Sequence, residues 1–91
     1  PELPEPYNNL AVLYAAAGKY DEAKNALDMA IRAHPGYATA YENLGDLHAR
    51  MAAQAYEKAL QIDSGNKTAQ NKLTLIRELM AGQSRQPAGR P

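Results

Sequence analysis

The chain has no cysteine, no tryptophan and no phenylalanine among its 91 residues. Without cysteine it can form neither a disulfide framework nor a thiolate metal site. Its 10 basic and 10 acidic residues give a net charge of +0, which argues against nucleic acid or an anionic membrane surface as the main partner. No run approaches the roughly 18 consecutive apolar residues of a membrane span, so we expect no membrane insertion. No basic segment followed by an apolar run marks a signal peptide.

Side chains that could carry out chemistry are also scarce. His48 has neither a carboxylate nor a second histidine four residues later, as a metal site on a helix would need. Glu42 and Asp46 stand four residues apart, a spacing that could serve acid–base catalysis, but Arg50 continues the row and favours a solvated ladder of charges. No nucleophile motif or phosphate-binding glycine loop is present. The sequence therefore predicts no enzyme, no metal site and no cofactor.

What the chain does have is helical periodicity over most of its length, which predicts an all-α fold. Glycine and proline separate the helical segments. Gly18 tolerates the left-handed conformation that ends a helix, and Pro35 cannot extend one. Asp21 is the expected N-cap of the second helix. We predict helices over residues 6–17, 21–34, 38–62 and 66–81, and a disordered tail over residues 82–91.

The central stretch, residues 38–63, reads as one long helix. Gly45, Ala52 and Ala59 follow one another at seven-residue spacing, which places them on one face. After Gly45, no glycine, proline, asparagine or serine interrupts the stretch before Asp63. The residues at 49–51 are strong helix formers, which favours a continuous helix; a tight turn at these residues is the alternative.

A pattern of fixed spacings runs through residues 7–35. It has the form W-x2-L-G-x2-Y, then A-x3-F, then P, with Tyr7 for the tryptophan, Ala11 for the glycine and Leu27 for the phenylalanine. In this pattern the chain resembles the tetratricopeptide repeat family, whose repeat is about 34 residues long. A second match begins with Tyr41, one repeat length after Tyr7. The matching positions are Tyr7, Leu10, Ala11, Tyr14, Gly18, Tyr20, Ala23, Leu27, Ala30 and Pro35, then Tyr41, Leu44, Gly45 and His48.

The second repeat is shorter than the first. Gly45 and Ala52 are seven residues apart, whereas their counterparts Ala11 and Ala23 are twelve apart, so the five residues that would make the turn are missing. The closing half of the repeat is still recognisable in Ala52, Tyr56, Ala59 and Leu60. We expect a tetratricopeptide-like domain over residues 1–81, with repeat 1 over 4–37, a shortened repeat 2 over 38–66 and a capping helix over 66–81.

The resemblance also predicts that the chain comes from a longer, bacterial protein, and it predicts which residues form the first core. Pro1 stands one repeat length before Pro35, where a preceding repeat would end, so we expect a fragment of a longer array. His48 occupies a position for an aromatic side chain and is expected to pack. The loose similarity of residues 8–23 to bacterial repeats suggests a bacterial protein, cytoplasmic or periplasmic. The predicted first core consists of Leu10, Tyr14, Ala23, Leu27, Tyr41, Leu44 and Gly45.

The function implied by the resemblance is a non-catalytic protein–protein interaction or assembly scaffold. If residues 38–63 form one helix, its second half cannot fold back on its first half, and large side chains such as Tyr56 are left exposed. A second copy of the chain would cover them, by crossing of the two long helices or by a domain swap, so we expect a homodimer. The residues predicted to mediate self-association are Gly45, Met51, Ala52, Tyr56, Ala59 and Leu60.

The alternative is a module that acts as a monomer within a larger protein and binds a peptide, or an extended segment of a protein partner, in a groove. Carboxamide side chains can both donate to and accept from a peptide backbone, and the acidic residues of the groove favour a neutral or basic ligand. The family's clamp for a C-terminal carboxylate does not match at Asn8 and Val12. As an exposed residue, Asn43 is expected to tolerate alanine at a cost below about 0.5 kcal/mol. The groove positions implied by the resemblance are Asn8, Asn9, Val12, Thr39, Glu42, Asn43 and Asp46.

Overall fold

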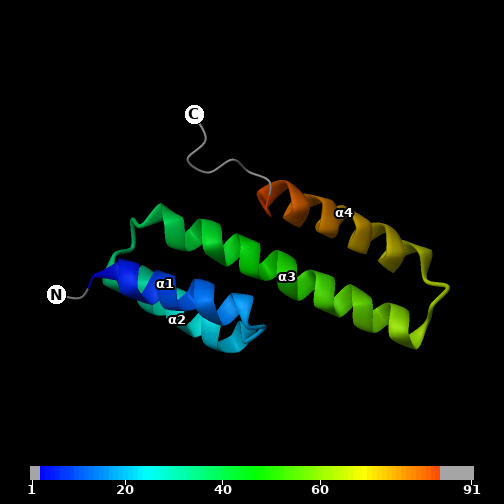
Figure 1. The fold of residues 1–91 in the computed structure, drawn as a ribbon, viewed down its shortest axis with the longest axis horizontal. Coiled ribbons are helices and arrows are strands. Elements are labelled where there is room, and N and C mark those ends of the chain that lie inside the picture. Colours follow the sequence, from blue (N-terminus) through cyan, green and yellow to red (C-terminus); the bar gives the residue numbers. More distant parts are fainter. Residues whose placement is uncertain (1–2, 85–91) are drawn as a thin grey trace. The chain divides into compact units, whose positions relative to one another are not determined.

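The computed structural model describes residues 3–84 and places four helices along this part of the chain (Figure 1). No strand occurs among the described residues, so the prediction of an all-α fold is confirmed. The chain groups into two compact units, unit 1 (Pro1–His48) and unit 2 (Ala49–Pro91). The helices are α1 (Pro4–Ala16), α2 (Tyr20–Ala33), α3 (Ala38–Ile62) and α4 (Lys67–Ser84).

The turn between α1 and α2 is closed by backbone hydrogen bonds. The Lys19 N–H donates to the Tyr14 carbonyl at 2.9 Å, and the Gly18 N–H donates to the Ala15 carbonyl at 3.1 Å. This pair of bonds is a Schellman motif, which satisfies carbonyl groups at the end of a helix. Gly18 has a φ of 77°, so its predicted left-handed conformation is confirmed. The turn reverses the chain and lays α2 beside α1 (Figure 1).

The start of α2 differs from the prediction. The helix begins at Tyr20 and its N-cap is Lys19, so the assignment of Asp21 as the N-cap is wrong. No side chain caps this end. Asp21 and Glu22 instead lie in the first turn, where the helix dipole favours negative charge.

Helix α3 is continuous over 25 residues. The prediction of one long helix is therefore confirmed with the expected bounds, and the alternative of a tight turn at residues 49–51 is wrong. The boundary between the two units falls within this helix, after His48. The missing five-residue turn would have stood at the same place.

Small side chains make up much of the core of unit 1. Ala23 and Leu27 are buried, as predicted, and Ala30 is buried beside them. In the part of α3 that belongs to unit 1, the buried side chains are Ala40 and Leu47. They lie in the part of α3 that completes unit 1 beside the α1–α2 pair.

Three residues of the predicted first core are not buried. Leu10 is 41% exposed, Tyr41 is 50% exposed, and Gly45 is also exposed. The assignment of these three residues to the core is wrong: Leu10 lines an open groove between α1 and α2, and Tyr41 and Gly45 lie at the surface of α3. Tyr14 and Leu44 are half-buried.

Unit 2 consists of the second part of α3 and helix α4, joined by a short turn. The Asn66 side chain caps α4 by accepting a hydrogen bond from the Ala69 N–H at 3.0 Å. Ala69 and Leu73 of α4 are buried. An exposed ion pair, from Arg77 to Glu57 at 2.8 Å, links the two helices. Helix α4 continues through residues 82–84, which the sequence assigned to the tail; residues 85–91 of that tail lie outside the described part of the chain.

Candidate functional site

The first candidate surface is a face of α3 in unit 1, which we call the open face: Tyr41, Gly45 and His48. The exposure of its central residue, Gly45, can be compared with that of Ala11, which holds the same position in the first repeat. Ala11 of α1 is only 2% exposed, whereas Gly45, one repeat later, is exposed. A methyl group added at Gly45 would meet no atom within 4 Å. His48 is exposed as well, so the expectation that it packs is wrong.

The second candidate surface is the closing segment, residues 52–60 of α3. Its residues repeat a pattern of α2, in which three alanines and one large side chain stand at fixed intervals. The residues of the closing segment are Ala52, Ala55, Tyr56 and Ala59, and those of α2 are Ala23, Ala26, Leu27 and Ala30. All four positions are buried in α2. In the closing segment Ala55 is exposed and the other three are half-buried. Met51 and Leu60 are also half-buried rather than fully exposed.

These two surfaces are the two halves of one repeat. In the first repeat, α2 packs beside α1, and Ala11 of α1 is buried. In the second repeat, the open face and the closing segment belong to the same continuous helix. Two segments of one helix cannot pack side by side, so each keeps a face that its counterpart in the first repeat buries.

The residues predicted to bind a peptide divide into two groups. Asn8 is only 5% exposed, and its Oδ1 accepts a hydrogen bond from Asn43 Nδ2 at 3.0 Å. These two carboxamides therefore join α1 to α3, and the expectation that both are exposed surface residues is wrong. Asp46 is half-buried. The remaining predicted residues, Asn9, Val12, Thr39 and Glu42, are exposed.

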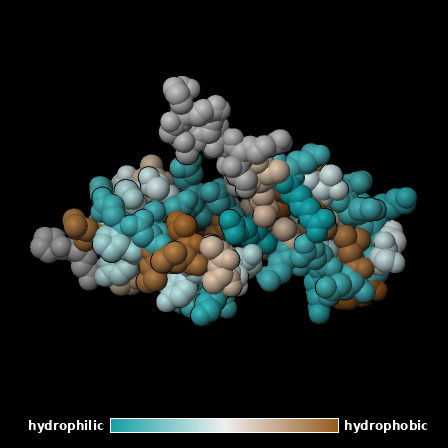
Figure 2. All heavy atoms as spheres, viewed as in Figure 1, coloured by the Kyte–Doolittle hydropathy of each residue, from teal (hydrophilic) through white to brown (hydrophobic). Residues whose placement is uncertain are grey.

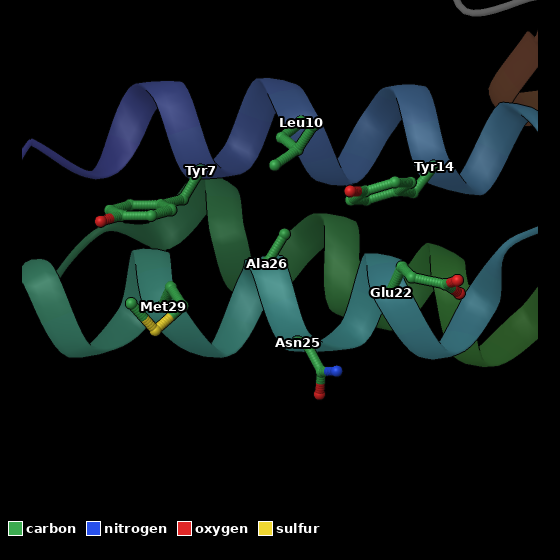
Figure 3. Close-up of a pocket in the computed structure, with 7 residues that line it drawn as sticks. All are labelled: Tyr7, Leu10, Tyr14, Glu22, Asn25, Ala26 and Met29. Atoms are coloured by element: carbon green, nitrogen blue, oxygen red, sulfur yellow. The ribbon is translucent and has the colours of Figure 1, made fainter.

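A groove between α1 and α2 was not among the predicted surfaces (Figure 3). It has a volume of about 280 Å³. Figure 3 shows Tyr7 and Met29 at one end, Tyr14 and Glu22 at the other, and Leu10 between them, with α3 behind the pair. The sequence carried no signal for this groove, because the repeat pattern placed Leu10 and Tyr14 in the core. We call this surface the α1–α2 groove: Tyr7, Leu10, Tyr14, Glu22, Asn25, Ala26 and Met29.

The described residues offer little for other kinds of site. No group of three or more histidine or acidic side chains among them could hold a metal ion. Within residues 3–84, no helix combines the length and the hydropathy that crossing a bilayer requires.

Comparison with protein families agrees with the repeat pattern. Two models described as tetratricopeptide repeat match the chain, one over residues 4–47 and the other over residues 31–66. Together they span α1, α2 and α3. No solved structure is significantly similar to the chain.

Three curated proteins are similar to the chain. A tetratricopeptide repeat domain-containing protein, PYG7, chloroplastic, of Arabidopsis thaliana is 33% identical over 85% of this chain and 27% of its own length. The heat shock protein STI1 of Saccharomyces cerevisiae is 27% identical over 89% of this chain and 15% of its own length. The uncharacterized protein ycf37 of Pyropia yezoensis is 32% identical over 77% of this chain and 42% of its own length. The chain thus spans less than half the length of each of these relatives.

Proposed function

Because the chain belongs to the tetratricopeptide repeat family, whose members generally act as non-catalytic protein-interaction scaffolds, we propose that it is an assembly module that self-associates by exchanging helix segments. The closing segment of one copy lies on the open face of a second copy, and the reverse contact completes a two-fold dimer. The module itself carries no catalytic activity.

The observation that carries this proposal is the difference between Ala11 and Gly45. The two residues hold the same position in successive repeats, yet Ala11 is 2% exposed and Gly45 is exposed. Helix α2, which packs beside α1 in the first repeat, carries Ala23, Ala26, Leu27 and Ala30 at fixed intervals. The same chain contains a second segment with that spacing, residues 52–60, so a second copy supplies a matching occupant.

The gain from covering the open face can be estimated from Tyr41. A tyrosine buries roughly 150–250 Å², so covering the exposed half of Tyr41 removes about 100 Å² from water and contributes about 2.5 kcal/mol. A two-fold dimer makes this contact twice, for about 5 kcal/mol. That figure lies at the low end of the roughly 4–15 kcal/mol that association costs, so the remainder must come from contacts of the closing segments.

Restoring the missing turn tests the proposal. Five residues copied from positions 17–21, inserted between Arg50 and Met51, separate Gly45 from Ala52 by twelve residues, as in the first repeat. We expect the natural chain to be a dimer and the insertion variant a monomer by light scattering at roughly tens of micromolar protein. As a matched control, the same five residues added after Ser64, in the turn before α4, should leave the dimer unchanged. A natural chain that is monomeric at these concentrations would refute the proposal.

A second candidate function, binding of an extended peptide, rests on the four exposed groove residues. The hydrogen bond between Asn8 and Asn43 brings α1 and α3 together, and Asn9 and Glu42 are their exposed chain neighbours. We expect a neutral or basic peptide partner to lose affinity when Asn9→Ala and Glu42→Gln are combined. If the affinity of an identified partner is unchanged by this double substitution, the peptide groove is not the binding site.

A further inference from the structure

Helix α1 has a buried stripe of residues whose counterpart on α3 is exposed. The buried residues of α1 stand at the i, i+4, i+7 spacing of one helix face, and one of them, Asn8, is hydrogen-bonded to Asn43 of α3. This stripe therefore marks the side of α1 on which the first helix of the next repeat packs. One repeat length later, the counterparts of all three residues are exposed. The α1 stripe consists of Pro4, Asn8 and Ala11, and the α3 stripe consists of Ala38, Glu42 and Gly45.

Helix α4 stands in the sequence where the next first helix would follow. Allowing for the five missing residues, the counterpart of Ala40 is Ala69, and both are buried. In unit 2, α4 is paired with the second part of α3, where Arg77 meets Glu57 at 2.8 Å. Because α4 and the closing segment belong to the same compact unit, a closing segment that lies on a second copy brings α4 with it.

The counterpart of the bond between Asn8 and Asn43 is then a pair of opposite charges. In that bond, Asn8 Oδ1 accepts from Asn43 Nδ2 at 3.0 Å. One repeat later, the acceptor position holds Glu42, whose carboxylate can only accept, and the donor position holds Lys72, whose ammonium can only donate. Both side chains are exposed, and within residues 3–84 neither of them forms an ion pair.

We propose that Glu42 of one copy pairs with Lys72 of a second copy, and that this ion pair makes the second copy the specific partner of the α3 stripe. The proposal rests on the proposed exchange of helix segments and names the contact that gives it specificity. Two-fold symmetry places two such pairs in each dimer. In its own chain, α4 is paired with Glu57, which lies about four turns further along α3 than Glu42.

Charge suits this task better than apolar area does. Hydrophilic side chains cover much of the visible surface, with hydrophobic ones between them (Figure 2). Apolar contact therefore distinguishes poorly between one helix and another. A pair of opposite charges at fixed positions excludes partners that carry the wrong sign, since a like-charge contact is repulsive.

Charge reversal tests the pair. In Glu42→Lys, and equally in Lys72→Glu, like charges meet twice in each dimer. We expect either substitution to raise the dissociation constant of the dimer at least about tenfold, measured by light scattering over a dilution series of the full chain. The combined variant, Glu42→Lys with Lys72→Glu, restores opposite charges and should dimerise as the natural chain does. An equal mixture of the two single variants should also dimerise, because each supplies the charge that the other lacks.

Controls separate the pair from a general effect of charge. Lys67→Glu makes the same change of charge at another exposed position of α4 and should leave the dissociation constant unchanged. The defect of Glu42→Lys should shrink in 1 M salt, where the Debye length falls to about 3 Å. Since all three positions are exposed, the variants should fold, which circular dichroism checks.

The outcomes distinguish this proposal from the one on which it rests. A natural chain that is monomeric contradicts both. If the natural chain is a dimer and the insertion variant a monomer, while Glu42→Lys and Lys72→Glu dimerise as tightly as the natural chain, segment exchange stands and the ion pair is wrong. Recovery in the combined variant but not in the equal mixture would place the pair within one chain and overturn the proposal. Weakening in the single variants with recovery in neither would overturn it as well, because the two charges would then act independently.

Discussion

The hydrogen bond between Asn8 and Asn43 gives the sharpest test of the packing in unit 1. Asn8 is 5% exposed, and Asn43 Nδ2 donates to its Oδ1 at 3.0 Å. Asn43→Ala leaves this buried acceptor without its donor. Leaving a buried polar group unsatisfied costs about 1–3 kcal/mol, compared with about 0.5 kcal/mol or less expected of a surface position. The structure therefore predicts a several-fold larger effect than the sequence does.

Chemical denaturation measures this cost as a shift in the midpoint at constant slope. In a thermal scan, each kcal/mol corresponds to roughly 4–8 °C for a domain of this size. The matched control is Asn9→Ala, which removes the same carboxamide from the neighbouring exposed position on α1. We expect it to change the free energy of unfolding by no more than about 0.5 kcal/mol.

A double-mutant cycle identifies the cause of the loss. Replacing both partners, as in Asn8→Leu with Asn43→Ala, removes the unsatisfied acceptor, and such paired replacements can be nearly neutral. We expect the double variant to be more stable than Asn43→Ala alone. Equal unfolding free energies for Asn43→Ala and Asn9→Ala, or strict additivity in the cycle, would refute the reasoning.

Three further predictions concern single elements of the fold. Gly18→Ala should destabilise the chain by about 1–2 kcal/mol, because a side chain is strained at a φ of 77°, and the denaturation midpoint will show it. Leu27→Ala should cost about 2–5 kcal/mol, since Leu27 is 1% exposed; Leu75→Ala, at an exposed leucine, should cost less than about 0.5 kcal/mol in the same assay. Arg77→Gln should cost at most about 1 kcal/mol and should cost less in high salt, because its ion pair with Glu57 is exposed to solvent.

The elements of the fold followed from local sequence. Helical periodicity and the strong helix formers at residues 49–51 predicted the continuity of α3, and Gly18 predicted the end of α1. These features depend on residues close together in the chain, where backbone sterics and side-chain spacing decide the outcome.

The error at Leu10 and Gly45 has a different origin. Periodicity identifies a face suited to burial, but it does not say whether another helix is available to cover that face. At Gly45 the repeat pattern assumed a second helix that the missing turn removed from unit 1, whereas Leu10 lines a groove between α1 and α2 that neither helix fills. The hydrogen bond between Asn8 and Asn43 could likewise not be predicted from the sequence. It joins residues 35 positions apart, and their polar side chains resemble those of ordinary surface residues.

The spacing of seven residues between Gly45 and Ala52 also fixes the angle between these two residues around the axis of α3. A helix turns by about 100° per residue, so seven residues bring the chain almost back to the same direction after two turns. Gly45 and Ala52 therefore lie about 20° apart around the axis of α3. One added alanine within this stretch would rotate the two surfaces by about 100° relative to each other, while the internal packing of each unit would keep its own residues. The angle between the two surfaces around the axis of α3 can therefore be changed without changing which residues pack inside either unit.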